Sequence, residues 1–526
     1  MALTADWVIG GPGGDAPRPV RDRLLPAMPG SRLWGWLGPL IVALFGAFLR
    51  FYRLGTPHAV VFDETFYAKD AFSTITYGVE RQFVDSADAL MLGGNTQIFK
   101  TCAQAAECGS FVAHPPLGKW MIGLGEWMFG LTPFGWRFMA ALAGSVSILI
   151  LARVARRLTR STLLGCLAGF LLALDAMHVV LSRTALLDVF LTLWVIAAFA
   201  CLVVDRDRSR ERLVAWYEGS LIAAPSRLGL RPWRLAAGLC LGAALATKWT
   251  GAYFVAAFTI MTLLWDAGAR RSIGQARPYR VSWRLDLPLG VVWTAVVPVV
   301  TWVASYAGWF ATDKGWGRNW AEATSSGWPY FVFSSLRSWL SYQKQMLGYH
   351  ANLSTAHPYQ SEPWQWPLLL RPVAFYYETP AGGCGASSCT SAILGTGTPV
   401  IWFLAVPALV AMVGWWLTSR DWRAGAVLGA YLVGWLPWFY FALADNRTMY
   451  QFYALPMLPF MILAIVLASG LILGPAPGRR RLVGSSVVGA FALLVLVNFW
   501  WLSPVLDAQV IPYGEWFDRM LFRSWI

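Results

Sequence analysis

The stretch LWGWLGPLIVALFGAFLRF (residues 33–51) is a continuous apolar run, and VFDETFY (residues 61–67) follows it after a short gap. The run is long enough to cross a hydrocarbon core of about 30 Å as a helix. Asp63 and Glu64 are thus two adjacent carboxylates just beyond the end of a span. Charge is unfavourable near hydrocarbon, by about 3 kcal/mol for an Asp at the centre of a span. The fold must therefore offset the unfavourable free energy of placing these two charges near hydrocarbon.

Similar apolar runs recur along the whole chain. Of its 526 residues, 57% are hydrophobic and 13% are charged, which excludes an ordinary soluble protein. The net charge of +14 does not indicate nucleic-acid binding, because the arginines cluster in short segments between the runs. Such clusters orient these segments towards the cytoplasm, facing anionic lipid. We therefore expect an all-α polytopic membrane protein. The clusters lie at residues 18–32, 153–160, 206–212, 270–284, 420–423 and 479–481.

The hydrophobic pattern predicts about eleven spans. A cytoplasmic N-terminal tail (1–32) precedes a transmembrane domain (33–503), and a C-terminal tail (504–526) lies outside the cytoplasm. Two large mixed segments, about 52–135 and 311–398, also lie outside. In the first, Leu117–Phe129 suits a helix in the membrane interface, and short surface helices are expected in the second. The predicted spans lie near 33–51, 138–153, 163–204 (two), 235–264 (two), 287–310, 400–417, 424–443, 450–473 and 483–502, with a basic segment at 205–234.

Cysteine positions agree with this topology. Cys102 and Cys108 lie in the first outer segment, and Cys384 and Cys389 lie in the second. Close pairs in an oxidising compartment predict the local disulfides Cys102–Cys108 and Cys384–Cys389. Free thiols are the alternative, and zinc is disfavoured because the two pairs belong to separate loops.

Most unusual ionisable residues map to the outer loops or to the outer ends of spans. A transporter would place such groups near the bilayer midplane, often in two related halves, and no internal repeat is visible. An enzyme that takes a sugar from a lipid phosphate would instead need an outward-facing base, cations and an apolar groove. Asp63 and Glu64 are the candidate bases, because neighbouring like charges raise the pKa of one carboxyl.

Four cations are candidates for a phosphate site: Arg137, Lys119, Lys248 and Arg447. Snorkelling to lipid headgroups is the alternative for each. His114 precedes two prolines and either binds substrate or caps the interfacial helix. Asp188 is expected to pair with Arg183 about one helical turn away. His350 and His357 either line an acceptor side or bond to loop backbone.

Taken together, six segments resemble the protein O-mannosyltransferases of the GT-C glycosyltransferase class, glycosyltransferase family 39, in a compact bacterial, actinobacterial-type form. The resemblance covers residues 33–503. A sugar-binding β-trefoil domain found in eukaryotic relatives does not fit within 311–398. The segments are Phe62-Asp63-Glu64, His114-Pro115-Pro116-Leu117-Gly118-Lys119, Arg137, Ser182 to Asp188, Thr247 to Gly251, and Arg447 to Pro456 with Tyr450.

The resemblance implies a GT-C fold and a polyprenyl-phosphate-mannose donor. It implies Ser or Thr hydroxyls of secreted or membrane proteins as acceptors, and inversion at the sugar carbon. It makes Asp63 the general base, with Glu64 as second choice or acceptor-orienting partner. Arg137 would hold the lipid phosphate, with His114, Lys119, Lys248, Arg183, Asp188, Arg447 and Tyr450 on the donor side and His350 and His357 on the acceptor side.

No cofactor is required as far as the sequence indicates. No carboxylate cage for a metal is visible, and the need for a divalent cation stays open. Contact with the secretion translocon is likewise open. The alternatives are a GT-C transferase acting on a lipid or polysaccharide, and, in a different class, a lipid transporter or flippase.

Overall fold

The computed structural model describes residues 19–26, 28–102, 108–219, 228–324, 333–474 and 478–526. Nine helical segments within these ranges are long and apolar enough to cross a membrane, so the chain is a multi-pass membrane protein. They are α2 (Trp34–Phe51), α6 (Pro133–Thr159), α9 (Asp188–Gly219), α11 (Gly251–Ser272), α13 to α14 (Leu287–Ser305), α18 (Pro399–Ser419), α19 to α20 (Trp422–Ala444), η5 to α21 (Gln451–Leu473) and α22 (Arg479–Leu502), which continues to Val505.

Two further predicted spans form shorter helices. Helix α7 (Thr162–Ala173) has 12 residues and α10 (Pro232–Thr247) has 16. At a rise of 1.5 Å per residue, α7 covers only about 18 Å of a 30 Å hydrocarbon core. The chain then breaks at Leu174 and Asp175 and continues as α8 (Ala176–Leu181). The total of eleven spans stays a prediction.

Helix α9 is longer than the sequence predicted. The predicted span ended near Val204, whereas α9 continues to Gly219. Asp205 on this extension is buried and accepts hydrogen bonds from Arg231 and Arg234, and both arginines also reach Asp266 on α11. Because each charge has partners of opposite sign, the helix can stay packed beyond the apolar run.

The spans differ greatly in how deeply they are buried. In Gln451–Leu473, 83% of the most apolar window is covered by the rest of the protein, compared with 17% for α22. Helix α21 (Leu458–Leu473) packs against α18, α19, α6 and α7. A helix that is apolar on every side is buried in a bundle or faces lipid, and these two helices show both cases.

The first outer segment folds into helices at one end of the bundle. They are α3 (Glu64–Tyr77), α4 (Ala87–Leu92) and α5, whose bounds, Leu117–Phe129, are those predicted for the interfacial helix. Helix α5 approaches the α8–α9 turn closely, because a Cβ on Gly118 would lie 2.6 Å from Leu187 Cδ2. Glycine at this position therefore permits the contact.

The second outer segment contains a sheet as well as helices. Its helices are α16 (Trp320–Ala323) and α17 (Ser334–Ala351). Strands β1 (Val373–Glu378) and β2 (Cys389–Gly395) pair antiparallel, and β3 (Val510–Pro512) adds to β2 in the order β1-β2-β3. The expectation of helices alone was therefore wrong. Strand β2 is buried along its whole length and so lacks the alternation that indicates a strand.

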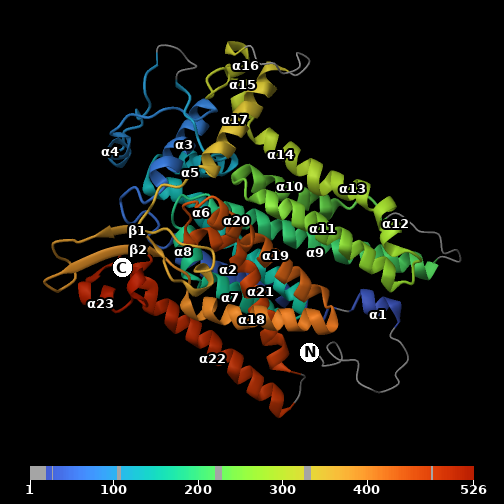
Figure 1. The fold of residues 1–526 in the computed structure, drawn as a ribbon. Helices are drawn as coiled ribbons and strands as arrows, with labels where there is room; N and C mark the ends of the chain where they lie inside the picture. The colour runs from blue at the N-terminus through green and yellow to red at the C-terminus, as the bar shows by residue number, and fades with distance from the viewer. Residues whose placement is uncertain (1–18, 27, 103–107, 220–227, 325–332, 475–477) are drawn as a thin grey trace.

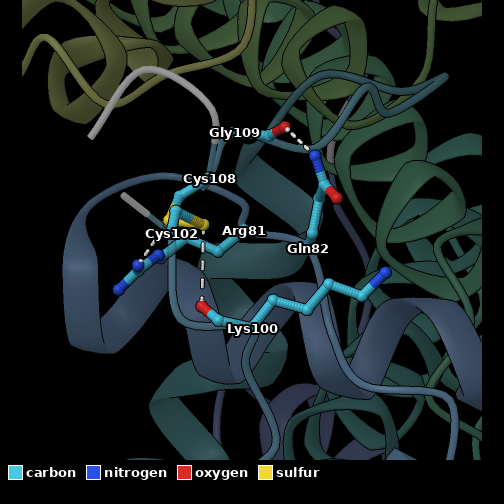
Figure 2. Close-up of a disulfide and its surroundings, with 6 residues drawn as sticks. All are labelled: Arg81, Gln82, Lys100, Cys102, Cys108 and Gly109. Carbon is cyan, nitrogen blue, oxygen red and sulfur yellow. Dashed lines mark hydrogen bonds between the residues drawn. A yellow bond between two sulfur atoms is a disulfide. The ribbon is translucent and has the colours of Figure 1, made fainter. Parts of the chain in front are cut away.

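Both predicted disulfides are present. Cys102–Cys108 and Cys384–Cys389 have Cα–Cα distances of 5.6 and 5.8 Å, within the usual range for a disulfide. Figure 2 shows the first of them beside Arg81, whose Nη2 donates to Cys108 Sγ, and Gln82, whose side chain reaches the Gly109 carbonyl. The second disulfide joins the β1–β2 loop, at Cys384, to the first residue of β2.

The two ends of the bundle differ in content. Helices α3 to α5, α15 (Ala307–Ala311), α16 and α17 gather at one end, with the sheet and α23 (Tyr513–Phe517) on the same side (Figure 1). The opposite end holds α1 (Val20–Leu24) and α12 (Pro278–Leu285) (Figure 1). Of the predicted N-terminal tail, residues 1–18 and 27 lie outside the described residues.

Asp175 fastens the α7–α8 break to α18. Its carboxylate accepts hydrogen bonds from the backbone of His178 (2.9 Å), from Trp402 Nε1 (2.8 Å) and from the backbone of Thr398 (3.3 Å). Each buried donor left unpaired costs about 1–3 kcal/mol.

We expect Asp175→Ala to lower the thermal unfolding temperature in detergent by several degrees. Asp518→Ala removes an exposed carboxylate and should change nothing; equal unfolding temperatures for both variants would contradict the assignment.

Candidate active site

Glu64 is a structural residue. Its side chain is completely buried, and both carboxylate oxygens bind Arg137: Oε1 accepts from Nε and Oε2 from Nη2, each at 2.8 Å. Oε1 also accepts from the Ala185 backbone and Oε2 from the Val61 backbone. Four donors therefore satisfy this carboxylate, which leaves it no capacity to take a proton from an acceptor hydroxyl.

The Arg137 side chain is also buried and fully hydrogen-bonded inside the protein. This disfavours the expected role in holding the lipid phosphate. Its side chain is 1% exposed. Besides Glu64, it donates to the carbonyls of Leu54, Pro57 and Ala59. A guanidinium has five N–H groups, and these contacts use all five. Arg137 therefore fixes the chain between α2 and α3 rather than presenting a charge to a ligand.

Asp63 has a different environment from its neighbour. Phe62 adopts a left-handed backbone conformation (φ 51°). Asp63 follows as the N-cap residue of α3, but its side chain makes no capping hydrogen bond. Within the described residues, no hydrogen bond or ion pair to its carboxylate is found. Asp63 is half-buried, and burial raises its pKa to about 6; the Lys248 charge opposes this rise and the Asp188 charge adds to it. A carboxyl so placed can accept a proton near neutral pH.

The two charges that act on Asp63 form an ion pair. Lys248 Nζ lies 3.0 and 2.8 Å from the two oxygens of Asp188. Asp188 begins α9, and Lys248 follows the end of α10. The prediction that Asp188 pairs with Arg183 was wrong. Arg183 instead donates to the carbonyls of Leu49, Arg50, Tyr52 and Arg53 at the end of α2, where a helix leaves its last carbonyls unpaired.

Asp188 and Lys248 line a cavity of about 260 Å³. Asp63 is not among the lining residues, but the charges of Lys248 and Asp188 both affect its pKa. The cavity combines a few polar groups with an apolar surface, as ligand sites do. Its other polar residues include His114, His350 and Arg447, and its aromatic ones include Trp249, Tyr253, Phe254, Trp438, Phe441 and Tyr453.

Arg447 is the second cation of this cavity. Its Nη2 contacts His350 Nδ1 at 3.3 Å, and its guanidinium carbon lies 5.5 Å from the centre of the Trp438 ring. Its Nε is buried without a hydrogen-bond partner, and no carboxylate pairs with Arg447 within the described ranges. A buried cation without a counter-charge is unfavourable, so the site favours an anion beside it.

Two histidines shape the same wall. The His114 and His350 rings stack with centroids 4.9 Å apart. His350 Nε2 donates to the Ala113 carbonyl at 2.6 Å, which leaves Nδ1 to accept from Arg447. Burial lowers the pKa of His350 to about 4, and the Arg447 charge acts in the same direction. His350 therefore stays neutral and orients the Arg447 guanidinium.

Lys119 is also paired inside the protein, which disfavours the phosphate role expected from the sequence. Its side chain is 1% exposed; Nζ forms an ion pair with Glu80 and donates to the His114 carbonyl at 3.1 Å. Lys119 therefore holds the His114 loop in place through its backbone carbonyl. Nδ1 of His114 is buried without a hydrogen-bond partner among the described residues.

Tyr450 and His357 lie together, and Tyr450 is close enough to Asp63 to be influenced by its charge. Their rings are 5.3 Å apart, and Tyr450 also contacts Phe62 at 6.4 Å. Burial raises the pKa of Tyr450, and the Asp63 charge raises it further, so this phenol stays protonated near Asp63. His357 Nδ1 accepts from the Tyr359 backbone, the loop-bonding alternative allowed by the sequence.

Family models match most of this chain. One described as dolichyl-phosphate-mannose-protein mannosyltransferase matches residues 40–284, and one for the C-terminal four-span region of protein O-mannosyltransferase matches residues 335–525. A polyprenol-phosphate-mannose–protein mannosyltransferase of Mycolicibacterium smegmatis is 41% identical over 94% of both chains. One of Mycobacterium tuberculosis is 40% identical over 94% of this chain and 93% of that one. The chain belongs to the protein O-mannosyltransferase family.

The fold agrees with membership of this glycosyltransferase family. The chain is similar to a subunit of the Saccharomyces cerevisiae Pmt1–Pmt2 complex, with a TM-score of 0.71 over 96% of this chain and 94% of that one, at 14% identity. An oligosaccharyltransferase of Archaeoglobus fulgidus matches with a TM-score of 0.51 over 93% of this chain and 57% of its own. The fold is thus of the GT-C type.

The sequence predicts most charged residues of the candidate site but not its aromatic walls. Tyr253, Phe254, Trp438 and Phe441 line the cavity and were not singled out. Trp438 and Phe441 are three residues apart on α20 (Pro437–Ala444), a spacing that places them on one face. That signal was available, but aromatic residues are so frequent near span ends that it did not distinguish them.

The Glu64–Arg137 pair is testable by stability. Removing one partner of a buried ion pair costs about 3–5 kcal/mol, because the other charge stays buried and unpaired. We expect Arg137→Ala to lower the thermal unfolding temperature in detergent by at least 5 °C. The exposed Arg280→Ala variant is the matched control and should unfold like the parent protein. If Arg137→Ala unfolded normally but used the lipid donor poorly, the phosphate role would be correct after all.

Proposed function

We propose that this protein transfers mannose from a polyprenyl-phosphate-mannose donor to Ser or Thr hydroxyls of secreted or membrane proteins. The observation that carries the proposal is the contrast between the two adjacent carboxylates. Glu64 has its oxygens saturated by Arg137 and backbone N–H groups, whereas Asp63 has a raised pKa beside the cavity. Family membership supports the same chemistry.

In the proposed reaction, Asp63 accepts the proton of the acceptor hydroxyl. The oxygen of that hydroxyl attacks the mannose carbon that is bonded to the phosphate. The bond from that carbon to the phosphate oxygen breaks, and the configuration of the carbon inverts. Polyprenyl phosphate leaves with the bonding electrons. A serine or threonine hydroxyl is a weak nucleophile, so a positioned base contributes about 10²- to 10⁴-fold.

The leaving phosphate needs positive charge rather than a proton. Arg447 and Lys248 line the cavity, and Arg447 has no carboxylate partner among the described residues. We assign these two cations to the donor phosphate in place of Arg137 and Lys119. Arg447 offers a planar fork of donors, while Lys248, already beside Asp188, supplies a point charge. These cations support transfer without a cofactor, so a chelator should leave the rate unchanged.

We place the acceptor on the side of Tyr450 and His357, where an aromatic face borders Asp63. The arginine clusters and the two disulfides support an orientation in which this end faces away from the cytoplasm, with the N-terminus cytoplasmic and the C-terminus outside. Contact with the secretion translocon is not required by the proposal.

Asp63→Asn tests the base. We expect kcat/KM for transfer of labelled mannose from polyprenyl-phosphate mannose to a Thr/Pro-rich peptide to fall about 10²- to 10⁴-fold, because the amide cannot accept the proton. In the parent protein, log(kcat/KM) should fall below about pH 6 as Asp63 becomes protonated, and this step should be absent from the variant's residual activity. The pH profile of both proteins with purified components is the measurement.

Asp85→Asn, which neutralises an exposed carboxylate of the same outer segment, should behave like the parent protein. An Asp63→Asn enzyme with near-normal activity would disprove the base assignment. Transfer to a lipid acceptor but not to the peptide would instead favour the alternative acceptor class.

Arg447→Gln tests the phosphate site. A hydrogen bond to a charged group contributes about 1.5–3 kcal/mol, so kcat/KM for the lipid donor should fall roughly 10- to 100-fold. Arg420→Gln is the control, because Arg420 also stacks on a tryptophan, 4.5 Å from the Trp416 ring, but is exposed and outside the cavity. Equal donor kinetics in both variants would show that Arg447 does not contact the phosphate.

A further inference from the structure

A second charged cavity lies at the end of α6 near Thr159, beside the part of α9 that extends beyond Val203 and beside the turn between α18 and α19. We call it the arginine cavity; its volume is about 450 Å³. Its wall is completed by Leu24 at the end of α1 and by Leu25, Pro26 and Met28 after it. Helix α1 lies at the end of the bundle opposite to α3 to α5 (Figure 1). This cavity is therefore separate from the candidate active site.

The lining of the arginine cavity is strongly basic. It contains six arginines against three carboxylates, Asp207, Glu211 and Asp421, so its net charge is positive. A neighbouring cavity of about 650 Å³ shares Arg156 and Arg157 with it and has no carboxylate in its lining. The arginines of the first are Arg156, Arg157, Arg160, Arg206, Arg210 and Arg423; the second adds Arg32, Arg153 and Arg208.

Ion pairs inside the protein account for only part of this charge. Arg157 binds Asp207 at 2.6 Å, and Arg423 binds Asp421 at 2.7 Å. Arg206 shares Asp207 at 3.2 Å, but its Nε is buried without a partner. Arg210 makes no hydrogen bond or ion pair within the described part of the chain, and its Nε is also buried. The cavity thus keeps positive charge that the protein does not neutralise.

Snorkelling does not explain these positions. A snorkelling arginine reaches water with its guanidinium, whereas Arg206 is 6% exposed and lies over Trp422, 3.3 Å from the ring centre. Clustered arginines that only satisfied the orientation rule would not need to enclose a cavity. Burial, charge and enclosure together indicate a site for an anion.

The neighbouring cavity shows what kind of anion fits. Its wall combines arginines with Trp36, Trp233, Val154, Ala200 and Val204. Trp36 and Trp233 are exposed on the helix surface, as tryptophans at a membrane interface are. The guanidinium of Arg153 stacks on Trp36, 3.6 Å from its ring centre. A ligand that fits this wall has both an anionic group for the arginines and an apolar part for the tryptophans and aliphatic side chains.

We propose that the two cavities bind a phospholipid with an anionic headgroup, taken from the membrane leaflet on this side. Arg206, Arg210 and the shared Arg156 and Arg157 hold the phosphate end. The acyl chains leave along Val154, Ala200 and Val204 beside the two tryptophans. Basic pockets between spans on the cytoplasmic side are a known means of lipid recognition.

The test uses the full-length protein, purified in detergent and stripped of lipid. Phosphatidylglycerol should raise its thermal unfolding temperature with saturation, and native mass spectrometry should retain bound lipid. Phosphatidylcholine, with the same chains, and glycerol 3-phosphate, with the same anionic group, should each do neither. Equal effects of glycerol 3-phosphate would identify a free phosphate site, and equal effects of phosphatidylcholine would show that charge is irrelevant; either result overturns the proposal.

Arg210→Gln is the main variant, because removing it leaves no carboxylate partner unpaired. Loss of one arginine near the headgroup should weaken phosphatidylglycerol binding about fivefold. Arg280→Gln is the matched control: Arg280 is an exposed arginine on α12, at the same end of the bundle, and lines neither cavity (Figure 1). Unchanged binding by Arg210→Gln, or equal weakening in Arg280→Gln, would show only general surface charge and refute the site.

Discussion

The buried ion pair between Glu64 and Arg137 is the interaction on which the candidate active site depends. It fixes the chain between α2 and α3 to α6, because Arg137 also holds three carbonyls of that connection. Glu64 in turn binds the backbone of Ala185 in the turn before α9. Three elements far apart in sequence thus meet at one carboxylate. The adjacent Asp63 is left facing the Lys248–Asp188 pair, with its own carboxyl unpaired among the described residues.

Pairing inside the protein also separates several structural charges from three arginines that line cavities. Lys119 with Glu80, and Arg231 and Arg234 with Asp205 and Asp266, are buried and paired. Each such pair offsets the cost of desolvation and holds two elements in place. Arg447, Arg206 and Arg210 are different, because each has a buried Nε without a partner and each lines a cavity. At both ends of the bundle, the positive charge of these arginines is incompletely paired inside the protein. Both ends therefore favour the binding of an anion.

The outer segments make this arrangement possible. Helix α5 lies against the α8–α9 turn at Gly118, and Lys119 on the same helix holds the His114 loop against the cavity. Helix α17 contributes His350, which directs Arg447. The site is therefore assembled by a cover of short helices over the ends of long ones. Reactive groups sit on loops and helix ends while the spans supply rigidity, as in other enzymes built on a fixed scaffold.

Features that depend on local composition could be predicted from the sequence. Long apolar runs fixed most of the spans, the bounds of α5 followed from its own pattern, and both disulfides followed from cysteines five or six residues apart. The sequence did not predict the sheet, because β3 comes from residues more than 110 positions after β2 and β2 is buried on both faces. Nor did it separate the two carboxylates: Asp63 and Glu64 are alike as side chains and differ only in their partners. The partners of Glu64 include Arg137 and Ala185, 73 and 121 positions away. Only the tertiary structure could therefore show that Glu64 is saturated, whereas Asp63 has no hydrogen-bond or ion-pair partner among the described residues.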